Sequence, residues 1–139
     1  MKIQDSVFGA MSYDYQWEKY EDLLLWGKQY HIKIVAESSS DDETEISEIQ
    51  RTAYLQFKGR FASLADSGLQ ELLVYCRNTL EIADCDVDTF WKNNQPSAVF
   101  FSITGEWGIL FESEFDPEDG IALMFSEEQW VVGPQEILI

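Results

Sequence analysis

The last third of the chain, residues 97–139, reads SAVFFSITGEWGILFESEFDPEDGIALMFSEEQWVVGPQEILI. It contains four short apolar runs rich in aromatic and β-branched residues, separated by Gly, Pro or acidic residues. Such runs between turn residues are typical of strands joined by short connections. We therefore expect this stretch to form four strands of an antiparallel meander and to be the core of the fold.

Apolar residues occupy both alternate positions in these expected strands. Val99 and Phe101 share one side, but Phe100 is also apolar. This pattern predicts strands that are buried on both faces. Helices can cover one face, so the other face must curl on itself or be covered by loops or by another chain.

The first part of the chain predicts further strands. Apolar and polar residues alternate over 15–26 and again over 29–37, on either side of a break that contains Gly27. Two alternating runs around such a break predict a hairpin. Before them, residues 7–11 are apolar and predict an edge strand or a lead-in to one.

The middle of the chain predicts two helices. Apolar residues recur every three or four positions over 43–63, and Ser40 with Glu43 forms the Ser-x-x-Glu pattern of a capping box. The same spacing continues over 67–82, where Ser67 begins a second capping pattern after a glycine-containing break. We expect two separate helices here.

The remaining connection, residues 83–96, is polar and predicts a loop. A chain of 139 residues has the size of one domain, and no Gly/Ser/Pro-rich linker divides it. The sequence thus predicts a single α+β domain over 1–139. Its core would be a curved antiparallel sheet of six to seven strands with two central helices packed on one face.

The charge of the chain is strongly negative and unevenly distributed. The formal net charge is −17, from 9 basic and 26 acidic residues, and no Lys or Arg follows Lys92. Such a charge attracts basic partners and repels nucleic-acid phosphates and anionic membranes. We expect a basic protein as partner, with no direct nucleic-acid or membrane binding.

The sequence also bears on the compartment. No apolar run approaches the roughly 20 residues of a membrane span, and the first residues lack the features of a targeting peptide. Cys76 and Cys85 show no metal-ligand spacing and are typical of reduced thiols. We expect a soluble, cytoplasmic protein.

The candidate partner-binding residues combine acids with one aromatic side chain. Trp91 lies beside Phe90 in a polar segment, and an exposed aromatic amid acids is typical of an interface anchor. Packing of that segment against the sheet would explain Trp91 equally well. The predicted partner-binding residues are Trp91, Glu112, Glu114, Asp116, Glu118 and Asp119.

Two other classes of site have weaker support. Asp84, Asp86 and Asp88 alternate as calcium ligands do, but the central Gly and the closing Glu of an EF-hand loop are missing. His31 and Cys76 would form a nucleophilic pair only if the fold joined them, and an exposed histidine and a core thiol are expected instead. We predict no catalytic residue, metal ligand or cofactor.

A resemblance covers nearly the whole chain. The motifs that carry it include Tyr13-Asp14-Tyr15-x-Trp17, Trp26-Gly27-Lys28-x-Tyr30, Gly105-Glu106-Trp107-Gly108 and Val132-Gly133-Pro134. With them the chain resembles a family of small acidic bacterial domains of unassigned function, similar to immunity-type proteins found beside secreted polymorphic toxins. These motifs are turns and core residues, with no catalytic set. The resemblance implies an acidic protein that masks a toxin, often a basic nuclease, in the producing cell.

Three functions follow as hypotheses. The first is an acidic protein-binding module, possibly an immunity protein that neutralises a basic toxin. The second is a small carboxylate-dependent hydrolase or metal-binding protein, because paired acids such as Glu112 and Glu114 could in principle do acid–base work. A variant of the first is a nucleic-acid mimic that inhibits a DNA-binding protein. The third is a structural subunit that self-associates through the second face of the sheet.

Overall fold

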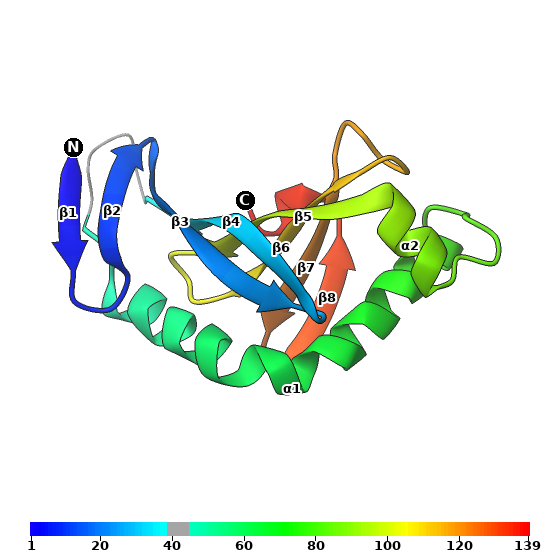
Figure 1. The fold of residues 1–139 in the computed structure, drawn as a ribbon, viewed down its shortest axis with the longest axis horizontal. Coiled ribbons are helices and arrows are strands. Elements are labelled where there is room, and N and C mark those ends of the chain that lie inside the picture. The colour runs from blue at the N-terminus through cyan, green and yellow to red at the C-terminus, as the bar shows by residue number, and fades with distance from the viewer. Residues whose placement is uncertain (39–44) are drawn as a thin grey trace.

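The computed structural model describes residues 1–38 and 45–139. One mixed sheet runs through this part of the chain, and its strand order follows the sequence from β1 to β8 (Figure 1). The strands are β1 (Lys2–Asp5), β2 (Gly9–Asp14), β3 (Gln16–Leu25), β4 (Lys28–Ala36), β5 (Asn94–Phe101), β6 (Trp107–Ser113), β7 (Ile121–Ser126) and β8 (Gln129–Gly133). The helices are α1 (Glu48–Asn78), α2 (Val87–Asn93) and the 3₁₀ turn η1 (Gln135–Ile137).

The expected α+β class is confirmed, and so are the β3–β4 hairpin and the C-terminal meander. The sheet has eight strands, however, where six to seven were expected. The edge strand or lead-in expected over 7–11 overlaps β2, and the additional strand is β1; the two form a hairpin at one end of the sheet. The Asp5 carboxylate closes their turn by accepting hydrogen bonds from the backbone N–H groups of Val7 and Phe8.

The sheet is also not wholly antiparallel. β4 and β5 run parallel, with Lys33 opposite Ala98 and Ala36 opposite Phe101, while every other neighbouring pair is antiparallel. Parallel neighbours need a long crossover connection. α1 lies in that connection and passes beneath the sheet in a shallow arc (Figure 1).

The prediction of two separate helices over 43–63 and 67–82 is wrong, because α1 is one helix of 31 residues. Ser67 caps nothing: its hydroxyl donates to the carbonyl of Leu64 inside the helix. Gly68 lies where α1 meets the sheet, and a Cβ there would come within 3.0 Å of Leu123. This glycine therefore permits close packing of the helix instead of ending it.

The N-terminus of α1 is capped further along the chain than expected. Ser47 accepts a hydrogen bond from the backbone N–H of Gln50, and the Gln50 side chain accepts one from the backbone N–H of Ser47. This reciprocal pair is a capping box. The predicted box of Ser40 and Glu43 lies outside the described residues.

The expected loop over 83–96 contains a helix and the start of a strand. Asp86 accepts a hydrogen bond from the Thr89 N–H at 2.8 Å and thereby caps α2. Phe90 on this helix is fully buried, and β5 begins directly after it. Burial of one large aromatic side chain stabilises this short helix, a tertiary effect that its polar composition conceals.

Both faces of the sheet are covered, as the apolar pattern predicts. One face packs on α1 in a large aromatic core. The opposite face carries a smaller cluster that includes Phe100, Leu110, Ala122 and Leu138, and Ile137 of η1 packs against it. In the described part of the chain, no helix is long and apolar enough to cross a membrane.

Candidate functional site

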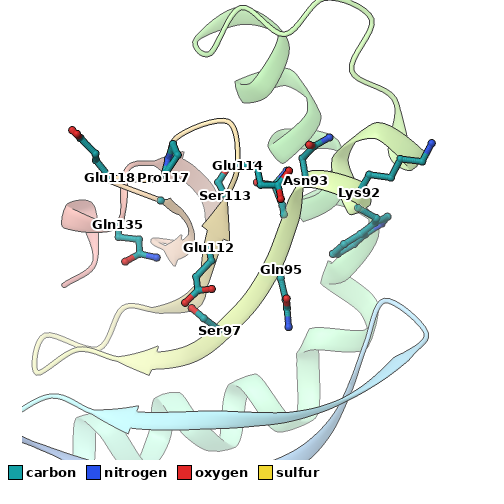
Figure 2. Close-up of a pocket in the computed structure, with 13 residues that line it drawn as sticks. Lys92, Asn93, Gln95, Ser97, Glu112, Ser113, Glu114, Pro117, Glu118 and Gln135 are labelled. Atoms are coloured by element: carbon teal, nitrogen blue, oxygen red, sulfur yellow. The ribbon is translucent and has the colours of Figure 1, made fainter.

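An open cavity of about 700 Å³ lies between the end of α2, β5, β6 and the loop that follows β6 (Figure 2). Four of the six predicted partner-binding residues line it: Trp91, Glu112, Glu114 and Glu118. Asp116 and Asp119 belong to the same loop but are not among the lining residues. The fold thus gathers most of the predicted residues around one concave surface.

The alternation of β6 directs Glu112 to the cavity. Phe111 is fully buried against the α1 face, so Leu110 and Glu112 point to the opposite face. Glu112 is exposed and pairs across the sheet with Gln95 of β5. One residue further on, a β-bulge between Pro96 and Ala98 lets the Ser97 hydroxyl donate to the Leu110 carbonyl.

The loop after β6 is held at both ends. The backbone N–H of Glu114 donates to the Asn93 carbonyl at 2.8 Å, which joins the loop to α2. At the other end, the N–H of Gly120 donates to the Asp116 carbonyl at 2.9 Å, closing the turn that the Asp-Pro-Glu-Asp-Gly run predicts. Gly120 has φ +63°, and a Cβ there would lie 2.8 Å from the Phe111 carbonyl oxygen. The acids therefore sit on a well-fixed turn.

Trp91 packs against the core with part of its ring and leaves another part exposed. It is half-buried, with ring centroids 5.3 Å from Trp26, 5.0 Å from Phe90 and 6.4 Å from Phe111. The Lys28 ammonium lies 5.3 Å from its ring centroid, in a cation–π contact. Core packing thus fixes the indole, while the remaining exposed part forms an apolar wall of the cavity.

The cavity carries unbalanced negative charge. All nine Lys and Arg residues lie in the described part of the chain, yet none forms an ion pair with the predicted acids. Lys92 lines the cavity, but Figure 2 shows its side chain extending away from Glu112. Over residues 93–139, the ion pair described by the structure is that of Glu128 with Arg60. Carboxylates without an ion pair around one hollow give it a negative potential.

Asn94 is a cavity residue that the sequence analysis missed. Its side chain is buried, with the residue 5% exposed, and its Nδ2 donates to the Phe90 carbonyl at 2.9 Å. Its Oδ1 has no hydrogen-bond partner in the described structure. The polar residues around Asn94 do not indicate that it is buried. Its burial depends on α2, which the sequence analysis did not predict.

The weaker candidate sites of the sequence have structural roles. Asp86 caps α2, and the hydrogen bond from the Thr89 N–H is the main cause that lowers the pKa of its carboxyl. His31 is exposed and pairs with Asp22 at 2.8 Å, whereas Cys76 is buried beside Cys85, as expected for an exposed histidine and a core thiol. Among residues 1–38 and 45–139, no three His, Cys, Asp or Glu side chains are grouped to hold a metal ion.

A second polar cluster joins β3 to α1. The Tyr54 hydroxyl donates to Glu21 at 2.5 Å, the Lys19 ammonium lies 3.0 Å from that hydroxyl, and Lys58 also pairs with Glu21. Burial lowers the pKa of Lys19, and burial with the nearby Lys19 charge lowers that of Lys58. Because Glu21 is shared by both ammonium groups, this cluster cross-links the helix to the sheet.

Residues 7–139 match a protein family described as a domain of unknown function, DUF6985. The chain belongs to this family. No curated protein and no solved structure matches the chain. The DUF6985 match includes every residue of the cavity and all elements from β2 to η1. The cavity is therefore part of the DUF6985 domain itself.

Proposed function

We propose that this DUF6985 domain is an acidic protein-binding module that docks a basic protein over the cavity beside Trp91. The observation that carries the proposal is the placement of Glu112, Glu114 and Glu118 around one open hollow, with no ion pair to a Lys or Arg of the described residues. Exposed carboxylates gathered on one surface repel one another, and no described ion pair offsets that repulsion here. These three remain available to a positively charged surface.

Two physical features support docking. Unpaired acids on a concave surface speed the encounter with a cationic partner and favour one orientation, an effect that salt screens. Trp91 and Pro117 provide apolar surface beside the acids, and the indole is already fixed by its core contacts. A rigid aromatic side chain loses little conformational entropy on binding, so it is a suitable anchor.

A narrower form of the proposal follows from the resemblance to immunity-type proteins. In that form the basic partner is a toxin, and docking blocks its active site in the cytoplasm of the producing cell. Support for this form comes from the motif resemblance and from the net charge of −17. A protein encoded beside this chain is the first partner to test, because toxin and immunity genes are expected to be neighbours.

The test compares two triple variants with the same change in net charge. Glu112→Gln, Glu114→Gln and Glu118→Gln remove the cavity acids, whereas Glu45→Gln, Glu71→Gln and Glu81→Gln remove exposed acids elsewhere that form no described ion pair. Association rates with the purified neighbour-encoded protein are measured over a range of salt concentrations. The cavity variant should associate more slowly and with a flatter salt dependence than the control variant.

Three results would contradict the proposal. If the two triple variants changed the association rate equally, net charge alone would explain the interaction. Stoichiometric binding of calcium, magnesium, manganese or zinc, lost in the cavity variant, would favour a metal-dependent role. Displacement of the partner by duplex DNA at the same surface would favour the nucleic-acid mimic instead.

A further inference from the structure

The two cysteines of the chain lie beside each other in the folded protein. Cys76 is near the end of α1, and Cys85 directly precedes Asp86, the residue that caps α2. Both cysteines are fully buried in the large core cluster, and a hydrogen bond joins their thiols. The segment between them belongs to the connection from α1 to α2 at one end of the molecule (Figure 1). The two sulfur atoms therefore meet at the base of a loop.

Backbone groups hold this loop against the end of α1. The Ile82 N–H donates a hydrogen bond to the Cys76 carbonyl at 3.0 Å. Nη1 of Arg77, the residue after Cys76, donates to the Cys85 carbonyl at 3.1 Å. Each cysteine thus accepts a hydrogen bond from a residue close in sequence to the other. The contact between the thiols is supported by these bonds as well as by side-chain packing.

Two residues of the same loop have a left-handed backbone. Glu81 has φ +59° and Asp84 has φ +56°, and both carry a Cβ. This conformation is unfavourable for residues other than glycine, so it persists only where the surrounding structure enforces it. Backbone strain of this kind is concentrated at functional sites. Here it lies between the two cysteines and accompanies the return of the chain that brings Cys85 to Cys76.

We propose that Cys76 and Cys85 form a disulfide by exchange with a small-molecule disulfide such as oxidised glutathione. The Cys85 thiolate attacks one sulfur of the oxidant, and the other half leaves as a thiolate. The Cys76 thiolate then attacks the Cys85 sulfur of the mixed disulfide and releases the second half. The cysteines lose two electrons, which reduce the oxidant to two thiols, and those thiols take up the two cysteine protons.

Burial controls when this reaction occurs. It raises the pKa of both thiols, that of Cys76 to about 12, so the pair in the closed loop is a poor nucleophile. At Cys85 the hydrogen bond from Cys76 and the charge of Arg77 oppose this effect, which makes Cys85 the first thiol to react. Asp84 and Asp86 on either side of Cys85 are exposed, so local opening of the loop admits the oxidant without unfolding the sheet.

The disulfide would attach α2 covalently to α1. α2 begins two residues after Cys85 and carries Trp91, which forms one wall of the cavity. A covalent bond at the base of the loop limits the local opening of the segment from 79 to 93. Oxidation would therefore fix the position of α2, whereas the reduced chain allows it to move.

The first experiment titrates the full chain with glutathione buffers, once folded and once unfolded in urea. Because the chain has only two cysteines, mass spectrometry without reductant identifies every product. The folded chain should form the internal disulfide, with the loss of two hydrogen atoms. Half-oxidation should need an about tenfold lower ratio of oxidised glutathione to the square of reduced glutathione than in urea. The fold already holds the thiols together, whereas the unfolded chain must lose entropy to join them.

Hydrogen exchange provides the second measurement. Backbone amides of residues 79–93 should exchange about tenfold more slowly in the oxidised chain than in the reduced chain, and those of β3 and β4 should not change. Cys85→Ser is the matched control, since it keeps the size of the side chain and cannot form the bond. Its exchange should not respond to oxidised glutathione. The glutathione titration needs no variant, so it still tests the inference if Cys85→Ser does not fold.

Several results would overturn the inference. These are equal glutathione ratios for the folded and unfolded chains, a mixed disulfide with glutathione that persists, dimers linked through sulfur, and thiols that stay unmodified in the folded chain. Faster or unchanged exchange of residues 79–93 after oxidation would also contradict it, because the bond would then not hold α2. None of these results affects the docking of a basic protein, which the cavity variants test separately.

Discussion

Arg51 donates two hydrogen bonds to a single carboxylate oxygen of Asp5, from Nε at 2.9 Å and from Nη2 at 2.7 Å. The other oxygen of Asp5 accepts the backbone N–H groups of Val7 and Phe8, each at 2.9 Å. The Asp5 side chain is only 1% exposed. One carboxylate thus closes the β1–β2 turn and joins it to Arg51 of α1, 46 residues away in sequence.

Asp5→Asn should destabilise the fold at neutral pH by about 2 kcal/mol, because it removes the charge from hydrogen bonds to a guanidinium while preserving the size of the side chain. Burial raises the pKa of the Asp5 carboxyl, but the hydrogen bonds from Arg51, Phe8 and Val7 together lower it by more. The pKa in the folded state is therefore below the ordinary value of 3.8.

The lowered pKa of Asp5 determines how the stability of the fold depends on pH. The stabilisation by Asp5 is complete above the ordinary value and is lost as the pH falls through the lowered pKa of the folded state. The difference between wild type and Asp5→Asn in urea unfolding should consequently shrink below about pH 4. Asp14→Asn, at an exposed position of β2, is the control and should change little. A pH-independent difference for Asp5→Asn would contradict the charged interaction.

Two glycines of α1 should respond oppositely to the same substitution. Gly59 is exposed and has no atom within 4 Å of an added Cβ, so Gly59→Ala should stabilise the fold by about 1 kcal/mol through helix propensity. At Gly68 the same Cβ would lie 3.0 Å from Leu123 and 3.1 Å from Trp130. Gly68→Ala should therefore gain nothing or lose stability. Thermal unfolding of both variants checks this, and an equal gain would show that the helix can move away from the sheet.

Removing the cavity acids should stabilise the isolated domain. Glu112, Glu114 and Glu118 repel one another and the rest of a chain of net charge −17, without ion pairs among the described residues. Their triple change to Gln should raise the free energy of unfolding by roughly 1 kcal/mol at low salt, and less at high salt. The Glu45, Glu71 and Glu81 variant should gain less, since those acids do not share one hollow. Equal gains would mean that the fold does not concentrate charge at the cavity.

The buried thiols predict a loss of stability at alkaline pH. Burial raises the pKa of Cys76 from 9.0 to about 12, so the folded state retains a proton that the unfolded chain releases. Its contribution is complete below the unfolded value and is lost as the pH rises from about 9 toward 12. Cys76→Ala should weaken this dependence between pH 9 and 10, before the tyrosines ionise. A chemical denaturation series over that range would show it, and identical slopes would contradict it.

Local sequence patterns predicted the elements that are held together by contacts between residues close in sequence. The alternation of β3 and β4 and the turn residues of β5–β8 were sufficient, because each strand pairs with its neighbour in sequence. Local rules failed where distant contacts decide. Gly68 suggests a helix end but serves packing against Leu123, and the β1–β2 hairpin depends on Arg51. Trp26 occupies a left-handed turn position at φ +49°, where its indole donates to the Ala65 carbonyl of α1.

The candidate site was predictable to the same extent. Glu112, Glu114 and Glu118 are close in sequence, so their shared surface could be expected from β6 and the turn alone. Trp91 joins them because α2 leads into β5, and that helix was predicted as a loop. The unpaired Oδ1 of Asn94 could not be predicted. It depends on the burial of Phe90, whose carbonyl accepts the hydrogen bond from Asn94 Nδ2.

The parallel pairing of β4 with β5 also bears on how the chain folds. Six of the seven strand pairings are between neighbours in sequence that close short loops, and such pairings form early. The seventh must bring together strands separated by the whole of α1, at a higher entropic cost of chain closure. We therefore expect β1–β4 and β5–β8 to form first and the pairing of β4 with β5 to complete the sheet. The folding rate should then depend on the residues of that pairing, Lys33 to Ala36 and Ala98 to Phe101.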